Sequence, residues 1–293
     1  MQRTRSEVEP ISFSMIQSTD DSIMPELPEV ETIARGLHQR IAGDVIESIW
    51  LGSKPEPLKS SASEISAALE SRKIIAVRRS GKHIVFDLES GGNKSNSAQW
   101  IVHLGMTGSL VVCTSDSGRE KHTHAVLQLA SGRELRFVDP RRFGRLSVID
   151  KFAAPGAEPL DISFDNFAAL FRGRKTPIKS ALLNQGLLSG VGNIYADETL
   201  FRAGIRPRRR AASLTRDDLR KLHQALKRVL KEAIRLGGSS ISNYVDSNGD
   251  EGFFQIKHRV YGREGKPCLV CKTSIKRIVI AGRSSHYCPK CQK

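Results

Sequence analysis

The stretch Met24-Pro25-Glu26-Leu27-Pro28-Glu29-Val30-Glu31 marks the change from a polar segment without periodicity to a patterned chain. From Glu29 onward apolar residues recur at helical spacing, and Gly43 follows them as a stop signal. Pro28 suits the first turn of a helix, where a missing N–H removes no helical hydrogen bond. The stretch therefore predicts an amphipathic helix that begins near residue 28 and ends before Gly43.

Pro25 and Glu26 also offer chemistry. If translation starts at Met24 and that residue is removed, Pro25 carries a free secondary amine, which can attack an aldehyde-like sugar carbon and form an iminium. Glu26 beside it can donate a proton to the sugar ring oxygen. An internal proline nitrogen is an amide and cannot react in this way. From spacing alone, the alternative that Pro25 and Pro28 merely begin a helix stays open.

The chain is strongly basic. Lys and Arg number 46 against 31 Asp and Glu, which gives a formal net charge of +15 over 293 residues. This excess favours a polyanionic partner because lysines and arginines displace counterions from phosphates, although a merely soluble basic protein is the simpler alternative. No apolar run has the length of a membrane span, and residues 1–24 resemble neither a secretory signal nor a transit peptide. We therefore expect a cytoplasmic protein without a membrane partner.

The periodicity changes along the chain. Short apolar, β-branched runs between residues 44 and 150 predict an antiparallel sandwich or barrel, with strands at Val45–Leu51, Lys73–Arg78, His83–Leu88, Trp100–Leu104, Ala125–Leu129, Glu134–Val138 and Arg145–Ile149. Later residues predict helices at Ser163–Leu170, Pro177–Leu183, Ile194–Ala203 and Thr215–Leu236. Asn193 is expected to cap the third helix. Cys113 follows an apolar run and is expected to be a small core residue.

Four of the five cysteines form two pairs near the C-terminus, Cys268-x-x-Cys271 and Cys288-x-x-Cys291. In a reducing compartment this spacing predicts one tetrahedral Zn²⁺ site, with the intervening segment folded back as a hairpin. Four thiolates leave no open position for water, so the zinc is expected to be structural. Arg283 follows Gly282 on the hairpin, which can place it at a turn that enters a nucleic-acid groove. A solvated surface charge is the simpler alternative for Arg283.

The segment Gly190-Val191-Gly192-Asn193 runs directly into a predicted helix. Small residues let the backbone approach a ligand, and the N–H groups at a helix start attract phosphate. Basic residues are frequent on both sides of this segment. The segment is a candidate phosphate site, and an ordinary helix-capping loop stays open as the alternative.

Several motifs occur in one order: Pro-Glu-Leu-Pro-Glu-Val-Glu at 25–31, His-Leu-Gly-Met-Thr-Gly at 103–108, Asp-Pro-Arg-Arg-Phe-Gly at 139–144, Gly-Val-Gly-Asn-Ile-Tyr-Ala at 190–196, and the four-cysteine unit. In this order they resemble the bacterial formamidopyrimidine-DNA glycosylase family over essentially residues 24–293. The resemblance implies an α+β multidomain protein. Its expected parts are a disordered extension or mis-assigned start at 1–24, a catalytic β-sandwich domain at 25–155, a helix-two-turn-helix DNA-binding domain at 156–257 and a zinc-finger hairpin at 258–293.

The resemblance also implies an activity. The expected enzyme is a base-excision repair glycosylase that removes oxidised purines, such as 8-oxoguanine and formamidopyrimidines, through a Schiff base on Pro25. As an AP lyase it then cuts the strand by β,δ-elimination. By the same resemblance, Glu26 assists base release and Lys82 transfers a proton during β-elimination. Arg283 grips the lesion phosphate and is assigned to δ-elimination.

The expected partner is double-stranded DNA containing oxidised bases, bound by a monomer in the bacterial cytoplasm in association with the nucleoid. The damaged nucleotide has to be flipped because its C1′ is out of reach in a stacked duplex. Met106, Arg141 and Phe143 match the family's intercalating trio, and core packing is the simpler alternative for the two apolar residues. The resemblance implies further DNA contacts at His122, Arg174, Lys179 and Asn193. Residues 238–255 match a loop that covers the extruded base.

Two rival functions stay open. An endonuclease VIII-like glycosylase for oxidised pyrimidines usually begins Pro-Glu-Gly-Pro-Glu, so Leu27 favours the purine branch. A non-catalytic damaged-DNA-binding protein is the second rival, because retention of residues 1–24 would block the Pro25 amine. One further departure from the family, Gly156-Ala157-Glu158-Pro159-Leu160 in place of Gly-Pro-Glu-Pro-Leu, falls in a loop.

Overall fold

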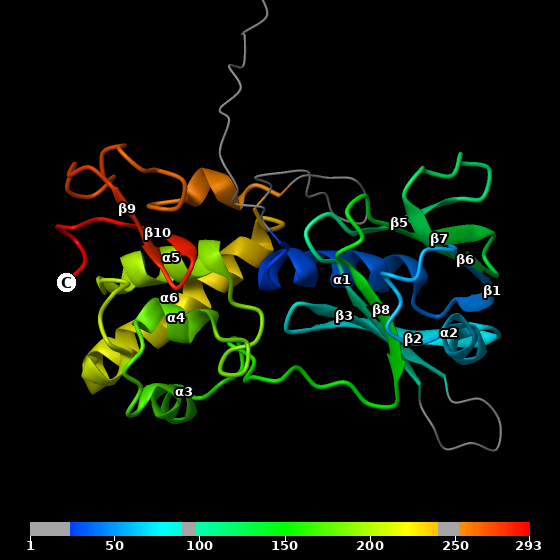
Figure 1. The fold of residues 1–293 in the computed structure, drawn as a ribbon, viewed down its shortest axis with the longest axis horizontal. Coiled ribbons are helices and arrows are strands. Elements are labelled where there is room, and N and C mark those ends of the chain that lie inside the picture. Colours follow the sequence, from blue (N-terminus) through cyan, green and yellow to red (C-terminus); the bar gives the residue numbers. More distant parts are fainter. Residues whose placement is uncertain (1–23, 90–97, 240–251) are drawn as a thin grey trace, which may run out of the picture.

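The computed structural model describes residues 24–89, 98–239 and 252–293. Figure 1 shows a strand-rich lobe beside a helical lobe that carries a small β-hairpin near the C-terminus. The predicted α+β architecture is therefore confirmed. The predictions for residues 1–23 and for most of 238–255 lie outside the described residues, and the domain bounds proposed from the resemblance stay predictions. Among the described residues, no helix is both long and apolar enough to cross a bilayer.

The strand-rich lobe is an antiparallel sheet. Within the described residues its spatial order is β5-β7-β6-β1-β2-β3-β4-β8. The strands are β1 Val45–Leu51, β2 Arg72–Ser80, β3 His83–Leu88, β4 Gln99–His103, β5 Ser109–Thr114, β6 Thr123–Leu129, β7 Arg133–Val138 and β8 Arg145–Ile149. All predicted strands are present, and the structure adds two elements that were not predicted, the strand β5 and the helix α2 (Ala62–Leu69). Cys113 is not a core residue: it alternates outward on the edge strand β5 and is half-buried.

A short seam divides the sheet into two halves. β1 pairs with β2 through Val45 and Ile46, whereas its pairing with β6 continues to Leu51. The two halves can therefore face one another across a shared core. Figure 1 shows helix α1 (Leu27–Ile41) lying between the half that contains β5, β7 and β6 and the half that contains β2 and β3. The apolar stripe of α1 joins the core that contains Phe86 of one half and Phe137 of the other.

Helix α1 belongs to both lobes. Val30 and the apolar residues after it pack in the core of the strand-rich lobe, while Leu27 is part of the core of the helical lobe. Pro28 lies in its first turn, as the sequence predicts. Because one rigid helix contributes to two cores, the residues just before it are held at the junction of the lobes.

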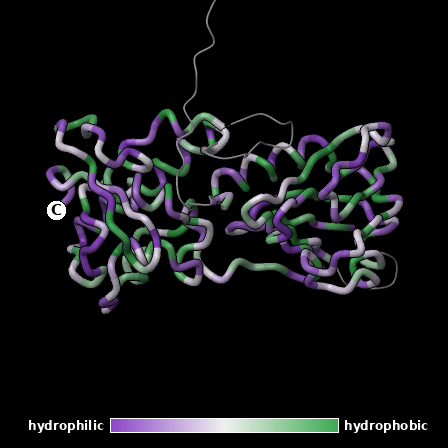
Figure 2. The backbone as a smooth tube through the Cα atoms, turned by 45° about the horizontal axis from the view of Figure 1, so that its top comes forward, coloured by the Kyte–Doolittle hydropathy of each residue, from purple (hydrophilic) through white to green (hydrophobic). Residues whose placement is uncertain are grey.

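The helical lobe contains α3 Phe164–Phe171, α4 Ile178–Leu183, α5 Asn193–Ala203, α6 Arg216–Arg235 and the short 3₁₀ helices Ala211–Ser213 and Phe254–Lys257. Thr215 and Asp218 form a capping box at the start of α6. The expectation that Asn193 caps α5 is wrong: Gly192 is the N-cap and Asn193 is already helical. Figure 2 shows hydrophobic and hydrophilic residues alternating along both lobes, as expected when each element turns one face inward.

The C-terminal hairpin consists of β9 Lys276–Ile280 and β10 Arg283–Tyr287. Ala281 and Gly282 form its turn with φ of 47° and 75°, a left-handed geometry that glycine adopts without strain. β10 packs against α5, so the hairpin is part of the helical lobe. Arg283 is the first residue after the turn, as the sequence predicts.

Candidate active site

Glu26 connects the start of α1 with the start of α5. Its carboxylate is 4% exposed and accepts hydrogen bonds from the backbone N–H of Ile194 at 3.1 Å and of Tyr195 at 3.5 Å. The N–H of Leu27 donates to the carbonyl of Gly190 at 3.0 Å. A buried carboxylate therefore occupies the positive end of α5.

Two glycines leave room for this contact. A Cβ on Gly192 would lie 2.2 Å from Cδ of Glu26, and a Cβ on Gly190 would lie 2.8 Å from Cβ of Leu27. The Gly-Val-Gly-Asn segment is thus a close-approach loop, as expected for small residues, but the N–H groups of Ile194 and Tyr195 meet a protein carboxylate. The alternative of a capping loop accounts for these two N–H groups, because Glu26 accepts them, and phosphate binding by the segment stays a prediction.

Burial raises the pKa of the Glu26 carboxyl to about 7. The positive charge of Lys82 and the N–H groups of α5 act in the opposite direction, while Glu29 adds to the increase. A carboxyl group that titrates near neutrality can hold a proton and release it to a leaving group under physiological conditions. Pro25, the preceding residue in the chain, is half-buried.

Lys82 lies in the turn between β2 and β3, and its pKa is lowered by burial. The carboxylates of Glu26 and Glu29 oppose this effect, and the charge of Arg283 adds to it. Lys82 is therefore electrostatically coupled to the N-terminal carboxylates and to the zinc-finger hairpin. Three residues predicted to be catalytic therefore come from separate segments, and Glu26 and Arg283 both influence the charge state of Lys82.

Glu29 is a site residue that the sequence pattern does not identify. Its fully enclosed carboxylate accepts hydrogen bonds from the hydroxyl of Tyr195 and from the backbone N–H of Ser239 at 2.7 Å. It also accepts the N–H of Glu26 at 3.0 Å. Burial raises its pKa. In the sequence Glu29 has the position of an ordinary acidic residue in the first turn of a helix. Only the repeated glutamates of Pro-Glu-Leu-Pro-Glu-Val-Glu could have indicated that it belongs to the site.

The residues of the expected wedge come together on two adjoining loops. The guanidinium of Arg141 lies 4.7 Å from the ring centroid of Phe143, which is 47% exposed. Met106 is half-buried on the other loop. Asp139 joins the loops, because its carboxylate accepts the Thr107 hydroxyl at 2.5 Å and the Gly144 N–H at 2.7 Å. The exposed ring argues against core packing for Phe143.

The structure places the remaining predicted DNA contacts in different environments. His122 and Arg174 are exposed. Asn193 is half-buried and donates to the hydroxyl of Ser284 at 3.2 Å. Lys179 is fully buried, and its ammonium pairs with Asp197 at 2.7 Å. In this structure the ammonium is therefore bound by protein groups, and a contact between Lys179 and a DNA phosphate stays a prediction.

The four paired cysteines form one cluster. Their sulfur atoms all lie within 4.8 Å of one another, with Cys268 and Cys291 at 3.9 Å and Cys271 and Cys288 at 3.4 Å. Four thiolates around zinc at its usual bond length of about 2.3 Å would be about 3.8 Å apart, so the cluster fits one tetrahedral Zn²⁺. Bound there, the ion would link the two ends of the hairpin without an open position for chemistry.

Comparisons with known proteins cover both lobes. The family model described as Formamidopyrimidine-DNA glycosylase N-terminal domain matches residues 24–146, the Formamidopyrimidine-DNA glycosylase H2TH domain matches 155–245, and the Zinc finger found in FPG and IleRS matches 265–293. The fold and the junctional site thus define a DNA glycosylase of the helix-two-turn-helix class. The chain belongs to the formamidopyrimidine-DNA glycosylase family.

Individual relatives agree over nearly their whole length. The formamidopyrimidine-DNA glycosylase of Solibacter usitatus is 49% identical over 92% of this chain and 100% of the relative. The crystal structure of MutM (Fpg) from Thermus thermophilus has a TM-score of 0.80 at 41% identity, covering 92% of this chain and 98% of that one. A complex of Lactococcus lactis Fpg with DNA containing FAPY-dG has a TM-score of 0.81 at 33% identity, covering 92% and 100%.

Replacing Gly192 with alanine should disrupt the site without straining the backbone. The φ of Gly192 is −125°, which alanine adopts, but the added methyl group would collide with the Glu26 carboxylate. Displacement of that group by about 1 Å is expected to slow base release about 100-fold in single-turnover assays. Gly118→Ala, where a Cβ meets nothing within 4 Å, is the matched control and should remain fully active. Normal base release by Gly192→Ala would contradict the assigned contact.

Replacing Cys288 with serine should remove the zinc. Structural zinc contributes on the order of 10 kcal/mol to the folding of such units, so the hairpin is expected to lose its order. Zinc content by atomic absorption and protease resistance of residues 258–293 would measure this. Cys113→Ser, on a half-buried cysteine outside the cluster, should retain the metal. Retention of full zinc by Cys288→Ser would show that the cluster is not the metal site.

Proposed function

We propose that this chain removes oxidised purines from double-stranded DNA as a base-excision repair glycosylase and then cuts the strand as an AP lyase. The observation that carries the proposal is the buried Glu26 carboxyl, with its pKa raised to about 7, next to Pro25 at the junction of the two lobes. Family membership supplies the reaction class, and the complex of the Lactococcus lactis relative with DNA containing FAPY-dG supports a formamidopyrimidine substrate.

The proposed chemistry begins with the amine of Pro25. This amine attacks C1′ of the damaged nucleotide, displaces the base and loses its proton. The C1′–O4′ bond of the sugar ring then breaks, its electron pair goes to a protonated O4′, and an iminium between sugar and protein results. Glu26 donates the proton that assists base release. Lys82 then moves a proton during the β-elimination that expels the 3′-phosphate, and its burial-lowered pKa makes such transfer easier. Arg283 holds the lesion phosphate for the δ-elimination that follows.

DNA recognition in this proposal depends on the wedge loops. The nucleotide is flipped out of the duplex so that C1′ reaches Pro25. Met106 and Phe143 fill the vacated space, and Arg141 bonds to the orphaned base. The exposed ring of Phe143 and the Asp139 bonds that fix both loops support this role. His122, Arg174 and Asn193 are proposed phosphate contacts.

The active form is proposed to begin at Pro25, because an amide nitrogen at that position would not react. The family match begins at Met24, and 92% of this chain accounts for the full length of the Solibacter relative, which supports this start. We further propose that the enzyme acts as a monomer in the bacterial cytoplasm, where its net charge of +15 favours association with nucleoid DNA.

Borohydride trapping on a duplex containing 8-oxoguanine tests the proposed nucleophile. Protein that starts at Pro25 should form a covalent adduct, because borohydride reduces the iminium to a stable amine. Protein that retains residues 1–24 should form none and should still bind the duplex, which makes it the matched control. An adduct of equal yield from both proteins would place the nucleophile elsewhere, and the absence of any adduct would exclude the lyase mechanism.

The pH dependence of base release tests the role of Glu26. A raised pKa keeps this carboxyl protonated below about pH 7, and the proton is lost as the pH rises through that value. The single-turnover rate of base release should therefore fall from the acidic to the alkaline side of neutrality. Glu26→Gln should be slow and should lack this limb of the profile. A wild-type rate that rises through neutrality would contradict proton donation by Glu26.

A further inference from the structure

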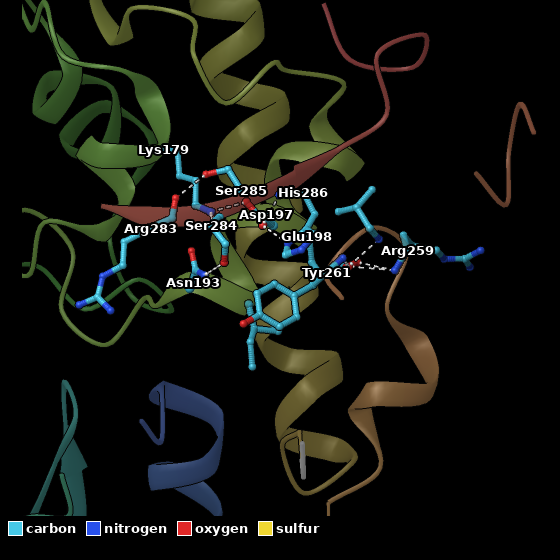
Figure 3. A network of polar contacts seen from close by, with 12 residues as sticks. Lys179, Asn193, Asp197, Glu198, Arg259, Tyr261, Arg283, Ser284, Ser285 and His286 are labelled. Atoms are coloured by element: carbon cyan, nitrogen blue, oxygen red, sulfur yellow. Dashed lines mark hydrogen bonds and ion pairs between the residues drawn. The ribbon is translucent and has the colours of Figure 1, made fainter. Parts of the chain in front are cut away.

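The helical lobe contains a buried ion pair that the reaction does not use directly. Lys179 on α4 and Asp197 on α5 are joined by a 2.7 Å contact between Nζ and Oδ1, and neither side chain is exposed. An uncompensated charge at such a position would be strongly destabilising, so the two groups have to be retained or removed together. Figure 3 shows the pair at the centre of a polar network that reaches the zinc-finger hairpin.

The pair binds the backbone of β10 at two points. The Lys179 ammonium donates to the carbonyl of Ser284 at 2.5 Å, and the N–H of His286 donates to Oδ2 of Asp197 at 2.8 Å. Backbone groups two residues apart in a strand point to the same side, so one ion pair satisfies a carbonyl and an N–H on one edge of β10. β9 pairs along the strand's other edge. Asn193 adds a bond from α5 to the Ser284 hydroxyl.

These contacts begin immediately after Arg283. That residue is exposed, and Figure 3 shows its side chain extending away from the network. The cysteine cluster constrains the chain at Cys288, beyond the other end of β10. The zinc site therefore holds the chain just after this five-residue strand, whereas the ion pair bonds its second and fourth residues, Ser284 and His286, the first of which adjoins Arg283.

We propose that Asp197 and Lys179 form a buried clamp that positions Arg283 on the lesion phosphate, which makes Asp197 a positioning residue for δ-elimination. The inference rests on the proposed function of Arg283. In δ-elimination a base removes the C4′ proton, the electron pair of that C–H bond forms the C4′–C5′ double bond, and the C5′–O pair leaves with the 5′-phosphate. Arg283 stabilises the negative charge on the departing phosphate, which requires its guanidinium to be correctly placed.

The experiment measures the two eliminations separately on a duplex with a preformed abasic site. The variants are Asp197→Asn, the double variant Lys179→Met with Asp197→Leu, and Arg283→Ala, all in the zinc-loaded enzyme that starts at Pro25. The double variant replaces both charges by apolar groups, a change that buried ion pairs often tolerate. Glu134→Gln is the matched control, because Glu134 forms a buried 2.6 Å pair with Arg136 in the other lobe.

Both clamp variants should retain zinc and should trap the iminium at a rate within about threefold of wild type. Their δ-elimination should slow about tenfold to about 100-fold, toward the value of Arg283→Ala, because small misplacements of a charge-stabilising group have effects of this size. Products would accumulate with the 5′-phosphate still linked to the sugar remnant. Glu134→Gln should show the wild-type ratio of β to δ products.

Three outcomes would overturn the clamp. A folded, zinc-loaded double variant with wild-type δ-elimination, beside a slow Arg283→Ala, would show that Arg283 needs no such positioning. Equal slowing of both eliminations together with zinc loss would reduce the pair to a purely structural role. Wild-type δ-elimination by Arg283→Ala would remove the proposed function of Arg283 itself, and the clamp with it. If Asp197→Asn fails to fold, the rate of δ-elimination by the double variant alone tests the clamp.

Discussion

The contact between the start of α1 and the start of α5 is the interaction on which the rest of the site depends. Glu26 binds the N–H groups of Ile194 and Tyr195, and the Leu27 N–H binds the carbonyl of Gly190. The partial positive charge at a helix start stabilises a carboxylate, while burial at the junction destabilises it. Burial has the larger effect, and the resulting pKa near 7 places the group in the range useful for proton transfer.

This balance requires a fixed arrangement of the lobes. α1 contributes to both hydrophobic cores, so Glu26 cannot move with one lobe alone. The turn that carries Lys82 is also tied to the segment between the lobes, because the Gly81 N–H and the Arg79 guanidinium both bind the carboxylate of Glu158 at 2.8 Å. The single-residue departure at Ala157 leaves this acid in place. The electrostatic coupling of Glu26 to Lys82 therefore depends on contacts across the whole interface between the two lobes.

Local patterns in the sequence predict most of the fold. The strands of the N-terminal lobe and the helices follow from periodicity and propensity, which act over a few residues. β5 is missed although it contains the apolar run Leu110-Val111-Val112, and α2 is missed because Ile65 and Leu69 are its only large apolar residues. The motifs also locate Pro25 and Glu26. What spacing cannot give is the partner of a polar group. The Gly-Val-Gly-Asn loop is correctly predicted as a close approach, but the group that approaches it is the side chain of Glu26. The spacing likewise does not reveal that the ammonium of Lys179 pairs with Asp197.

The position of Lys179 has a physical reason that neither its charge nor its spacing reveals. A well-packed apolar pair would hold α4 against α5 at least as firmly, since desolvation offsets much of the attraction within a buried ion pair. An apolar pair could not, however, bind a carbonyl and an N–H on the edge of β10. Hydrophobic contact fixes how closely two elements approach, whereas hydrogen bonds to the backbone also fix the register and direction of a strand. A charged group that has to meet one phosphate oxygen needs its strand fixed in both respects. Cohesion of the helical lobe is therefore provided by its apolar core, and the orientation of the hairpin is provided by polar bonds at Ser284 and His286.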